Sequence, residues 1–246
     1  MSDAAPEQAH GQAGPAVPAV PVEAPTSTEQ AAQRQQLGEV IRASHSAFTV
    51  ETYELHSTPP LGALVVAQDV LGVVCSAQTE SLTPISALGS PEDEDGGVYT
   101  IYPDLQRILR SQFDALVVGC YLRFDGLVRG PVYAYPECPP RVHYKCWLAS
   151  NAELVEFTSR PDYLRLLLCS AESANVDQVI IHLVLKAFRA RDRDRDWLFS
   201  TAEYLGRQLK GDYDRLLALL KTLDALTQSA PQSQPGIADS IGTVKY

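Results

Sequence analysis

Three stretches of the chain decide its fold: Leu37-Gly38-Glu39-Val40-Ile41, Leu61-Gly62-Ala63-Leu64-Val65 and Leu71-Gly72-Val73-Val74-Cys75. Each is a Leu-Gly pair that leads into apolar, largely β-branched residues. This pattern favours a strand entered through a bend that only glycine adopts easily. The three pairs start 24 and then 10 residues apart, which leaves room for short antiparallel strands. The pattern therefore predicts a small β-barrel.

The residues around these pairs predict where the strands begin and end. We expect strands over 37–43 and 47–53, and a hairpin formed by 62–67 and 70–77 around Gln68-Asp69. Pro103 and Asp104 are typical of the start of a short helix.

Two further extended segments complete the expected barrel. The most convincing strand covers 115–124, and Asp125-Gly126 behind it indicates a hairpin, because glycine accepts the positive φ of a type I′ turn. A last extended segment is expected over 142–148. The barrel would then hold about six strands.

From Ser150 onward the apolar period becomes helical. Ser150 and Glu153 fit a capping box, in which the serine accepts from a free backbone N–H and the glutamate reaches back. A helix over 176–190 is apolar on two adjoining stripes, so we expect it to be packed on more than one side. The remaining helices are expected over 163–168, 197–209 and 213–226.

These elements predict an α+β protein with an N-terminal antiparallel β-barrel and a C-terminal helical bundle. The expected boundaries are a disordered Pro/Ala-rich tail over 1–36, the barrel over 37–149, the helical domain over 150–228 and a flexible tail over 229–246. Both tails lack the large apolar residues needed to offset the entropy of ordering them.

Charge and cysteine content narrow the function. The net charge is −10, and residues 1–97 carry 13 acidic and 2 basic side chains, so the barrel half repels phosphate backbones.

Five cysteines without regular spacing argue against a disulfide framework and favour buried thiols in a reducing cytosol. The most apolar stretch, 179–185, is too short to span a bilayer. We expect a cytoplasmic protein without membrane contact.

The chain resembles the HAS-barrel family, named for the archaeal helicase HerA and ATP synthase. Members pair a six-stranded barrel with Leu-Gly strand openings, and the likeness covers roughly 37–228. Besides the three openings, the matching segments are Pro139-Pro140-Arg141-Val142-His143, Glu153-Leu154-Val155-Glu156-Phe157 and Tyr163-Leu164-Arg165-Leu166-Leu167-Leu168.

The resemblance implies a partner rather than a reaction. In the helicases of this family the barrel precedes a hexameric ATPase and helps to hold ring subunits and partner proteins. A P-loop needs Gly-x-x-x-x-Gly-Lys-Ser/Thr to cradle phosphate, and this chain contains no Gly-Lys pair. The chain is therefore similar to the barrel of such a helicase without its motor.

Two groups of residues could bind a metal ion, and the sequence favours a structural role for both. Cys138, His143 and Cys146 invite a zinc site, but if 142–148 is a strand, His143 and Cys146 point to opposite faces. The acidic stretch Glu92-Asp93-Glu94-Asp95 lacks the ligand spacing of a calcium loop, and a solvated loop that contacts a basic partner is favoured.

Two further patterns point toward nucleic acid, and neither is favoured. Arginines and aspartates alternate from Arg189 to Asp196, which favours a salt-bridged helix end over a phosphate site. Five tyrosines could stack on bases, but without a basic groove barrel packing is favoured. They are Tyr99, Tyr102, Tyr121, Tyr133 and Tyr135.

The sequence predicts no catalytic, cofactor-binding or metal-binding residues, since no hydrolase elbow, zinc helix or dinucleotide fingerprint is present. We expect a non-catalytic assembly module that docks on a larger complex, in the family's case a HerA-like ATPase or a nuclease of DNA processing, or that forms a homo-oligomer. The alternative is a nucleic-acid-binding barrel, although direct nucleic-acid binding is disfavoured by charge. A metal-dependent hydrolase that uses His143 is the remaining competitor.

Overall fold

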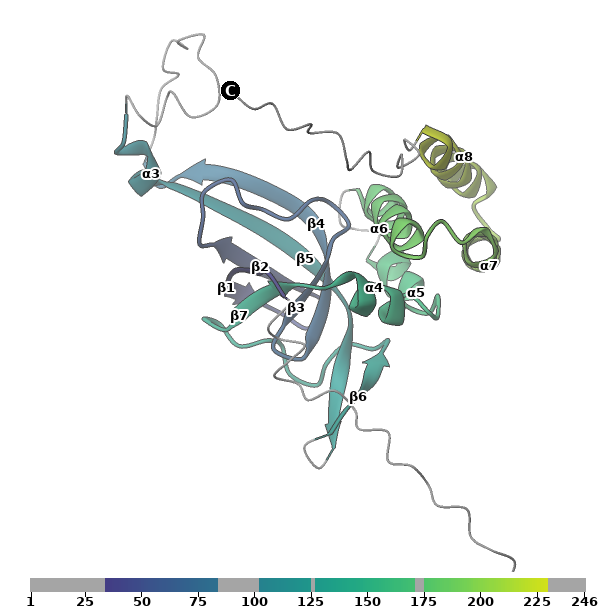
Figure 1. The fold of residues 1–246 in the computed structure, drawn as a ribbon, viewed down its shortest axis with the longest axis horizontal. Helices are drawn as coiled ribbons and strands as arrows, with labels where there is room; N and C mark the ends of the chain where they lie inside the picture. Colours follow the sequence, from purple (N-terminus) through teal and green to yellow (C-terminus); the bar gives the residue numbers. More distant parts are fainter. Residues whose placement is uncertain (1–33, 84–101, 125–126, 171–174, 230–246) are drawn as a thin grey trace, which may run out of the picture. The chain divides into compact units, whose positions relative to one another are not determined.

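The computed structural model describes residues 34–83, 102–124, 127–170 and 175–229 (Figure 1). Apart from residues 34–36 and 229, both expected tails lie outside these residues. So do the acidic stretch 92–95 and the expected turn Asp125-Gly126.

A closed antiparallel barrel forms the first part of the described chain. Its strands are hydrogen-bonded in the order β2-β1-β7-β3-β4-β5, and β2 pairs with β5 to close the ring. Strand β6 extends the sheet beyond the closure by pairing with β5. The predicted six-stranded barrel is confirmed. The strands are β1 (Gln36–Ala43), β2 (Ala47–Thr52), β3 (Leu64–Ala67), β4 (Val70–Ser81), β5 (Leu109–Phe124), β6 (Leu127–Val132) and β7 (Lys145–Leu148).

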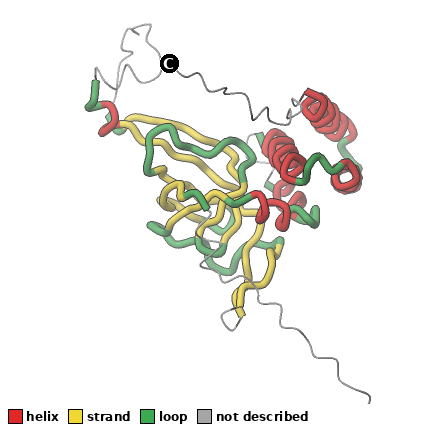
Figure 2. Tube along the Cα trace, viewed as in Figure 1, coloured by secondary structure: helices red, strands yellow, loops and turns green. Residues whose placement is uncertain are grey.

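Helices follow the barrel, as predicted. Helix α6 lies against β4 and α5 against β5, while α4, α7 and α8 pack on α6 (Figures 1 and 2). None of the helices in the described ranges is long and apolar enough to cross a membrane. The helices are α3 (Leu105–Ile108), α4 (Asn151–Phe157), α5 (Tyr163–Cys169), α6 (Val176–Ala190), α7 (Arg195–Gln208) and α8 (Tyr213–Ser229).

Alternate residues of the central strands belong to two separate cores. In β3, Val65 packs inside the barrel with Phe48 and Phe113. Its neighbours Leu64 and Val66 face outward and pack in the cluster that contains the helices. This alternation follows from the two-residue period of a strand. The helices therefore cover an outer barrel face that is apolar in its own right.

A buried carboxylate joins the start of the barrel to the first helix behind it. The predicted capping box is confirmed: Ser150 Oγ accepts from the Glu153 amide, and the Glu153 carboxylate accepts from the Ser150 amide at 2.9 Å. The same carboxylate also accepts from the Arg34 guanidinium, at 3.1 Å from Nε and through a second, Nη2 contact. Glu153 thus accepts a hydrogen bond from a free backbone N–H at the α4 N-terminus and links this end of the helix to the segment before β1.

Of the glycines in the three Leu-Gly pairs, Gly62 fits the predicted bend, whereas Gly38 and Gly72 are required for a different reason. Only Gly62 has a positive φ, at 71°. Gly38 and Gly72 lie within β1 and β4 next to register shifts, where a neighbour comes close. A Cβ on Gly38 would lie 1.9 Å from the Glu51 carbonyl oxygen, and one on Gly72 would lie 2.7 Å from the Phe48 ring. Close approach at β-bulges, not bending, requires these two glycines.

Three strands begin or end at least three residues away from the expected positions. Strand β7 begins only at Lys145, because Val142 and His143 form a turn in which His143 has a φ of 66°. Strands β4 and β5 reach further than expected, to Ser81 and back to Leu109, as a hairpin that extends toward α3 (Figure 1). The added length is mostly polar, so it lacks the apolar signal that marks the buried part of these strands.

The role of Gly38 leads to a stability prediction. We expect Gly38→Ala to lower the free energy of unfolding by at least about 2 kcal/mol, because the new methyl group has no space beside the β2 backbone. Gly211→Ala is the matched control, since nothing lies within 4 Å of a Cβ at that position. Urea denaturation of both variants measures the difference. Equal stabilities would contradict the role assigned to Gly38.

Candidate interaction groove between helices α7 and α8

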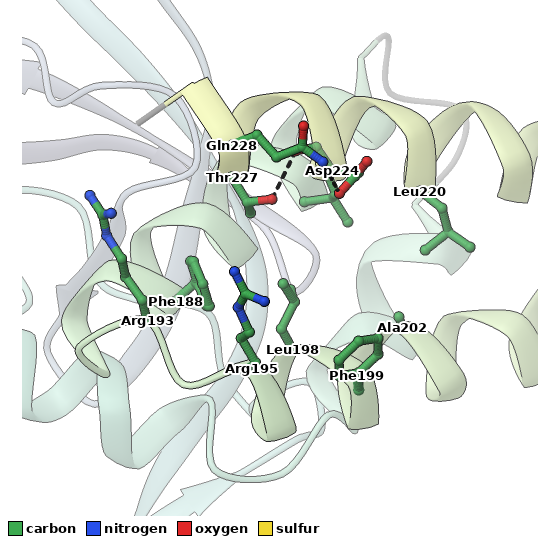
Figure 3. A pocket seen from close by; sticks show the side chains of 11 residues that line it. Phe188, Arg193, Arg195, Leu198, Phe199, Ala202, Leu220, Asp224, Thr227 and Gln228 are labelled. Atoms are coloured by element: carbon green, nitrogen blue, oxygen red, sulfur yellow. Dashed lines mark hydrogen bonds between the residues drawn. The ribbon is translucent and has the colours of Figure 1, made fainter. Parts of the chain in front are cut away.

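A groove of about 350 Å³ opens between the end of α6, helix α7 and helix α8 (Figure 3). Its walls come from three parts of the chain that are separated in sequence by the α6–α7 turn and the α7–α8 turn. The lining residues are Phe188, Arg193, Arg195, Leu198, Phe199, Ala202, Leu220, Leu223, Asp224, Thr227 and Gln228.

The floor of the groove continues the hydrophobic core. Phe188 and Leu223 are 6% and 4% exposed. On α7, one apolar stripe runs through Leu198, Ala202 and Leu205 at helical spacing. Leu205 is fully buried, whereas Leu198 and Ala202 are only half-buried and line the groove. The stripe is thus buried at its Leu205 end and open at its Leu198 end.

Phe199 stands at the rim of this open end. Its side chain is 72% exposed, more than any other large apolar side chain of the described residues for which exposure is known. A single exposed apolar residue is ordinary on a protein surface. Here, however, the ring adjoins a half-covered apolar stripe, and it widens the apolar surface available to a binding partner.

The rim of the groove carries positive charge at one end. Arg193 and Arg195 project there, and Arg195 forms no ion pair within the described ranges. On the opposite wall, Gln228 Nε2 donates to the Asp224 carboxylate at 2.8 Å, and Thr227 Oγ1 donates to the Asp224 carbonyl at 2.9 Å (Figure 3). The groove therefore combines an apolar floor with guanidinium groups that can meet carboxylates.

The wall that carries these arginines is fixed by Arg191. Its Nη2 donates to the Val155 carbonyl at 2.6 Å and to Thr158 Oγ1 at 3.0 Å, and its guanidinium lies 4.8 Å from the centre of the Trp197 ring. Burial lowers the pKa of Arg191. Asp194 caps α7 by accepting from the Trp197 amide at 3.1 Å. The expected helix end is present, but Arg191 binds a carbonyl and a hydroxyl at the end of α4 where a salt bridge to an aspartate was expected, and its guanidinium lies over the Trp197 ring of α7.

The predicted zinc candidates do not come together. Cys146 is fully buried inside the barrel, whereas Cys138 and His143 are exposed. His143 Nδ1 lies 3.6 Å from a Glu39 carboxylate oxygen. Within the described ranges, no three His, Cys, Asp or Glu side chains are arranged to hold a metal ion.

The tyrosines divide into two groups, apart from Tyr99, which lies outside the described residues. Tyr121 and Tyr133 pack against the core, and the Tyr133 hydroxyl donates to the Phe157 carbonyl at 2.7 Å. Tyr102 and Tyr135 are 45% and 42% exposed. The predicted packing is confirmed for Tyr121 and Tyr133 and is wrong for Tyr102 and Tyr135.

A hollow of about 570 Å³ at the β2–β4–β5 side of the barrel is lined by the Cys75 thiol and the Asp114 carboxylate among other groups. Asp114 accepts from Thr49 Oγ1 at 2.6 Å and from Ser76 Oγ at 2.9 Å. Burial and then the Asp114 charge raise the pKa of the Cys75 thiol to about 11. This thiol is protonated at neutral pH, so it is not an activated nucleophile.

The groove was not predicted from the sequence. Phe199 directly follows Leu198 of the apolar stripe, and this widening of the stripe was the available signal. The sequence pattern does not show how α8 packs beside α7.

Comparison with family models and with curated proteins gave no match. The likeness to HAS-barrel proteins therefore stays a prediction, and a barrel fold alone does not assign a function.

The cysteine environments predict a pattern of thiol reactivity. At neutral pH a maleimide should modify Cys138 and Cys169 rapidly, because both are exposed. Cys75 and Cys146, whose pKa values are raised to about 11 and about 12, should react at least about 100-fold more slowly. Peptide mass mapping measures each rate. Rapid labelling of Cys146, or protection of Cys138 by added zinc, would contradict the assignment.

Proposed function

We propose that this protein is a non-catalytic assembly module whose α7–α8 groove binds a segment of a protein partner. The observation that supports the proposal is the half-covered apolar stripe of α7 beside the exposed Phe199. Binding interfaces combine a desolvated apolar centre with a polar rim, and aromatic and arginine side chains contribute most to their affinity.

The positive charge at the rim favours a partner segment that carries acidic residues. Arg193 and Arg195 stand at one end of the groove, and Arg195 has no carboxylate partner within the described ranges. An amphipathic helix with apolar anchors on one face and acidic residues at one end complements this surface. A helix that lies in a groove presents such anchors at i, i+3 or i+4 and i+7.

The resemblance to HAS-barrel proteins suggests where this partner belongs. In that family the barrel accompanies a hexameric ATPase, so a HerA-like ATPase or a nuclease of DNA processing is the proposed complex. A second copy of the chain is a different occupant of the groove, and the experiments below separate the two. The nucleic-acid alternative has less support, because the expected barrel half is strongly acidic.

Site-specific crosslinking tests the proposal. A photoreactive amino acid at position 199 should crosslink a partner segment in cells, whereas one at the exposed Tyr213 outside the groove should not. The crosslinked peptide should be acidic and amphipathic. A peptide from this same chain would identify the groove as a self-association surface. A basic peptide, or equal crosslinking from both positions, would contradict the proposal.

Affinity measurements with the identified segment give the second prediction from the groove. Phe199→Asp should weaken binding at least about 10-fold, because it removes the exposed ring beside the apolar stripe and puts there a negative charge that repels an acidic segment. Arg195→Glu should weaken binding as well, and its effect should shrink at high salt. Tyr213→Asp is the matched control, since it replaces another highly exposed aromatic residue outside the groove. Unchanged affinity of Phe199→Asp would overturn the proposal.

A further inference from the structure

A third hollow, of about 320 Å³, lies at the seam between the barrel and the helices. The barrel contributes Leu64 of β3 and Leu148 of β7, helix α4 contributes Asn151 and Leu154, and α6 contributes Lys186 and Arg189. It is separate from the α7–α8 groove, with which it shares no lining residue.

Two cations line this hollow without a counter-ion. Lys186 and Arg189 are three residues apart on α6, so they lie on the same side of the helix. Lys186 is half-buried and Arg189 is exposed, and within the described ranges neither side chain forms an ion pair or a hydrogen bond. Burial and then the Arg189 charge lower the pKa of Lys186.

Other part-buried cations have partners. Arg34 pairs with Glu153, and Arg215 pairs with Asp177 at 2.6 Å. Arg191 donates to the Val155 carbonyl and to the Thr158 hydroxyl. A partly desolvated charge with no partner is unfavourable, and a neighbouring like charge adds to that cost. Lys186 is such a charge, and an anion bound in the hollow would supply its missing partner.

The rest of the lining determines what kind of anion fits. Leu64, Leu148 and Leu154 form an apolar surface, and the Asn151 amide adds a polar group. The volume is at the lower end of the range of about 300–1,000 Å³ that is usual for ligand pockets. We propose that this hollow binds a small organic carboxylate, with its head group between Lys186 and Arg189 and a short apolar tail against the three leucines.

A series of straight-chain carboxylates tests head and tail separately. We would titrate the full chain with acetate, butyrate and hexanoate at constant ionic strength and follow the backbone amide shifts. Affinity should rise about fourfold for each added CH₂, or about 15-fold from butyrate to hexanoate. Inorganic phosphate serves as a head-only probe. Equal binding of phosphate and hexanoate, or no saturable shifts with hexanoate, would overturn the proposal.

Variants then locate the site. Lys186→Met should weaken hexanoate binding at least about 10-fold, whereas Lys210→Met, which removes an exposed lysine elsewhere, should leave it unchanged. Without ligand, Lys186→Met should unfold at the same or a higher temperature, because it removes an unneutralised charge and keeps the apolar stem. Hexanoate binding that survives Lys186→Met would overturn the assignment. The groove variant Phe199→Asp should bind hexanoate normally, so the two sites are tested independently.

Discussion

Strands β3, β4 and β5 are apolar on both faces, and the rest of the structure depends on burying both. Their inner face includes Val65, Val74 and Val117 and is covered when the sheet closes through the β2–β5 pairing. Their outer face includes Val66, Val73 and Val118, and closure of the barrel does not bury it. The helices supply that second cover. Barrel and helices therefore share one continuous core and meet through packed side chains.

The helices are not equivalent in this arrangement. Helix α6 lies between the barrel and the outer helices, and most of its apolar side chains are buried. Helices α7 and α8 have few buried residues and pack on α6 from the outside. Burial thus decreases with distance from the barrel, and the incompletely covered apolar stripe of α7 lies where that burial ends. The groove is a consequence of the layering.

The sequence predicted most of the fold because apolar periodicity and local caps carry that information. Helix α6 and the Ser150–Glu153 capping box agree with the pattern, and so does the strand count of the barrel. The polar halves of β4 and β5 escaped prediction because cross-strand hydrogen bonds, which leave no apolar signature, hold them extended. Gly38 and Gly72 were recognised but explained wrongly, since close approach by a distant strand is not visible in a local window. Neither the α7–α8 groove nor the hollow between the barrel and the helices was predicted, because each depends on how non-adjacent elements pack.

The two walls of the α7–α8 groove are anchored to different parts of the fold. Arg191 and Trp197 bind the start of α7 to α4 through Val155 and Thr158, so this wall is braced against a second helix. Helix α8 is held by Leu219 and Leu223 in the core and by the Arg215–Asp177 ion pair. The two walls of the groove therefore rest on different helices, α7 on α4 and α8 on α6, so the width of the groove depends on how α4 and α6 pack against each other.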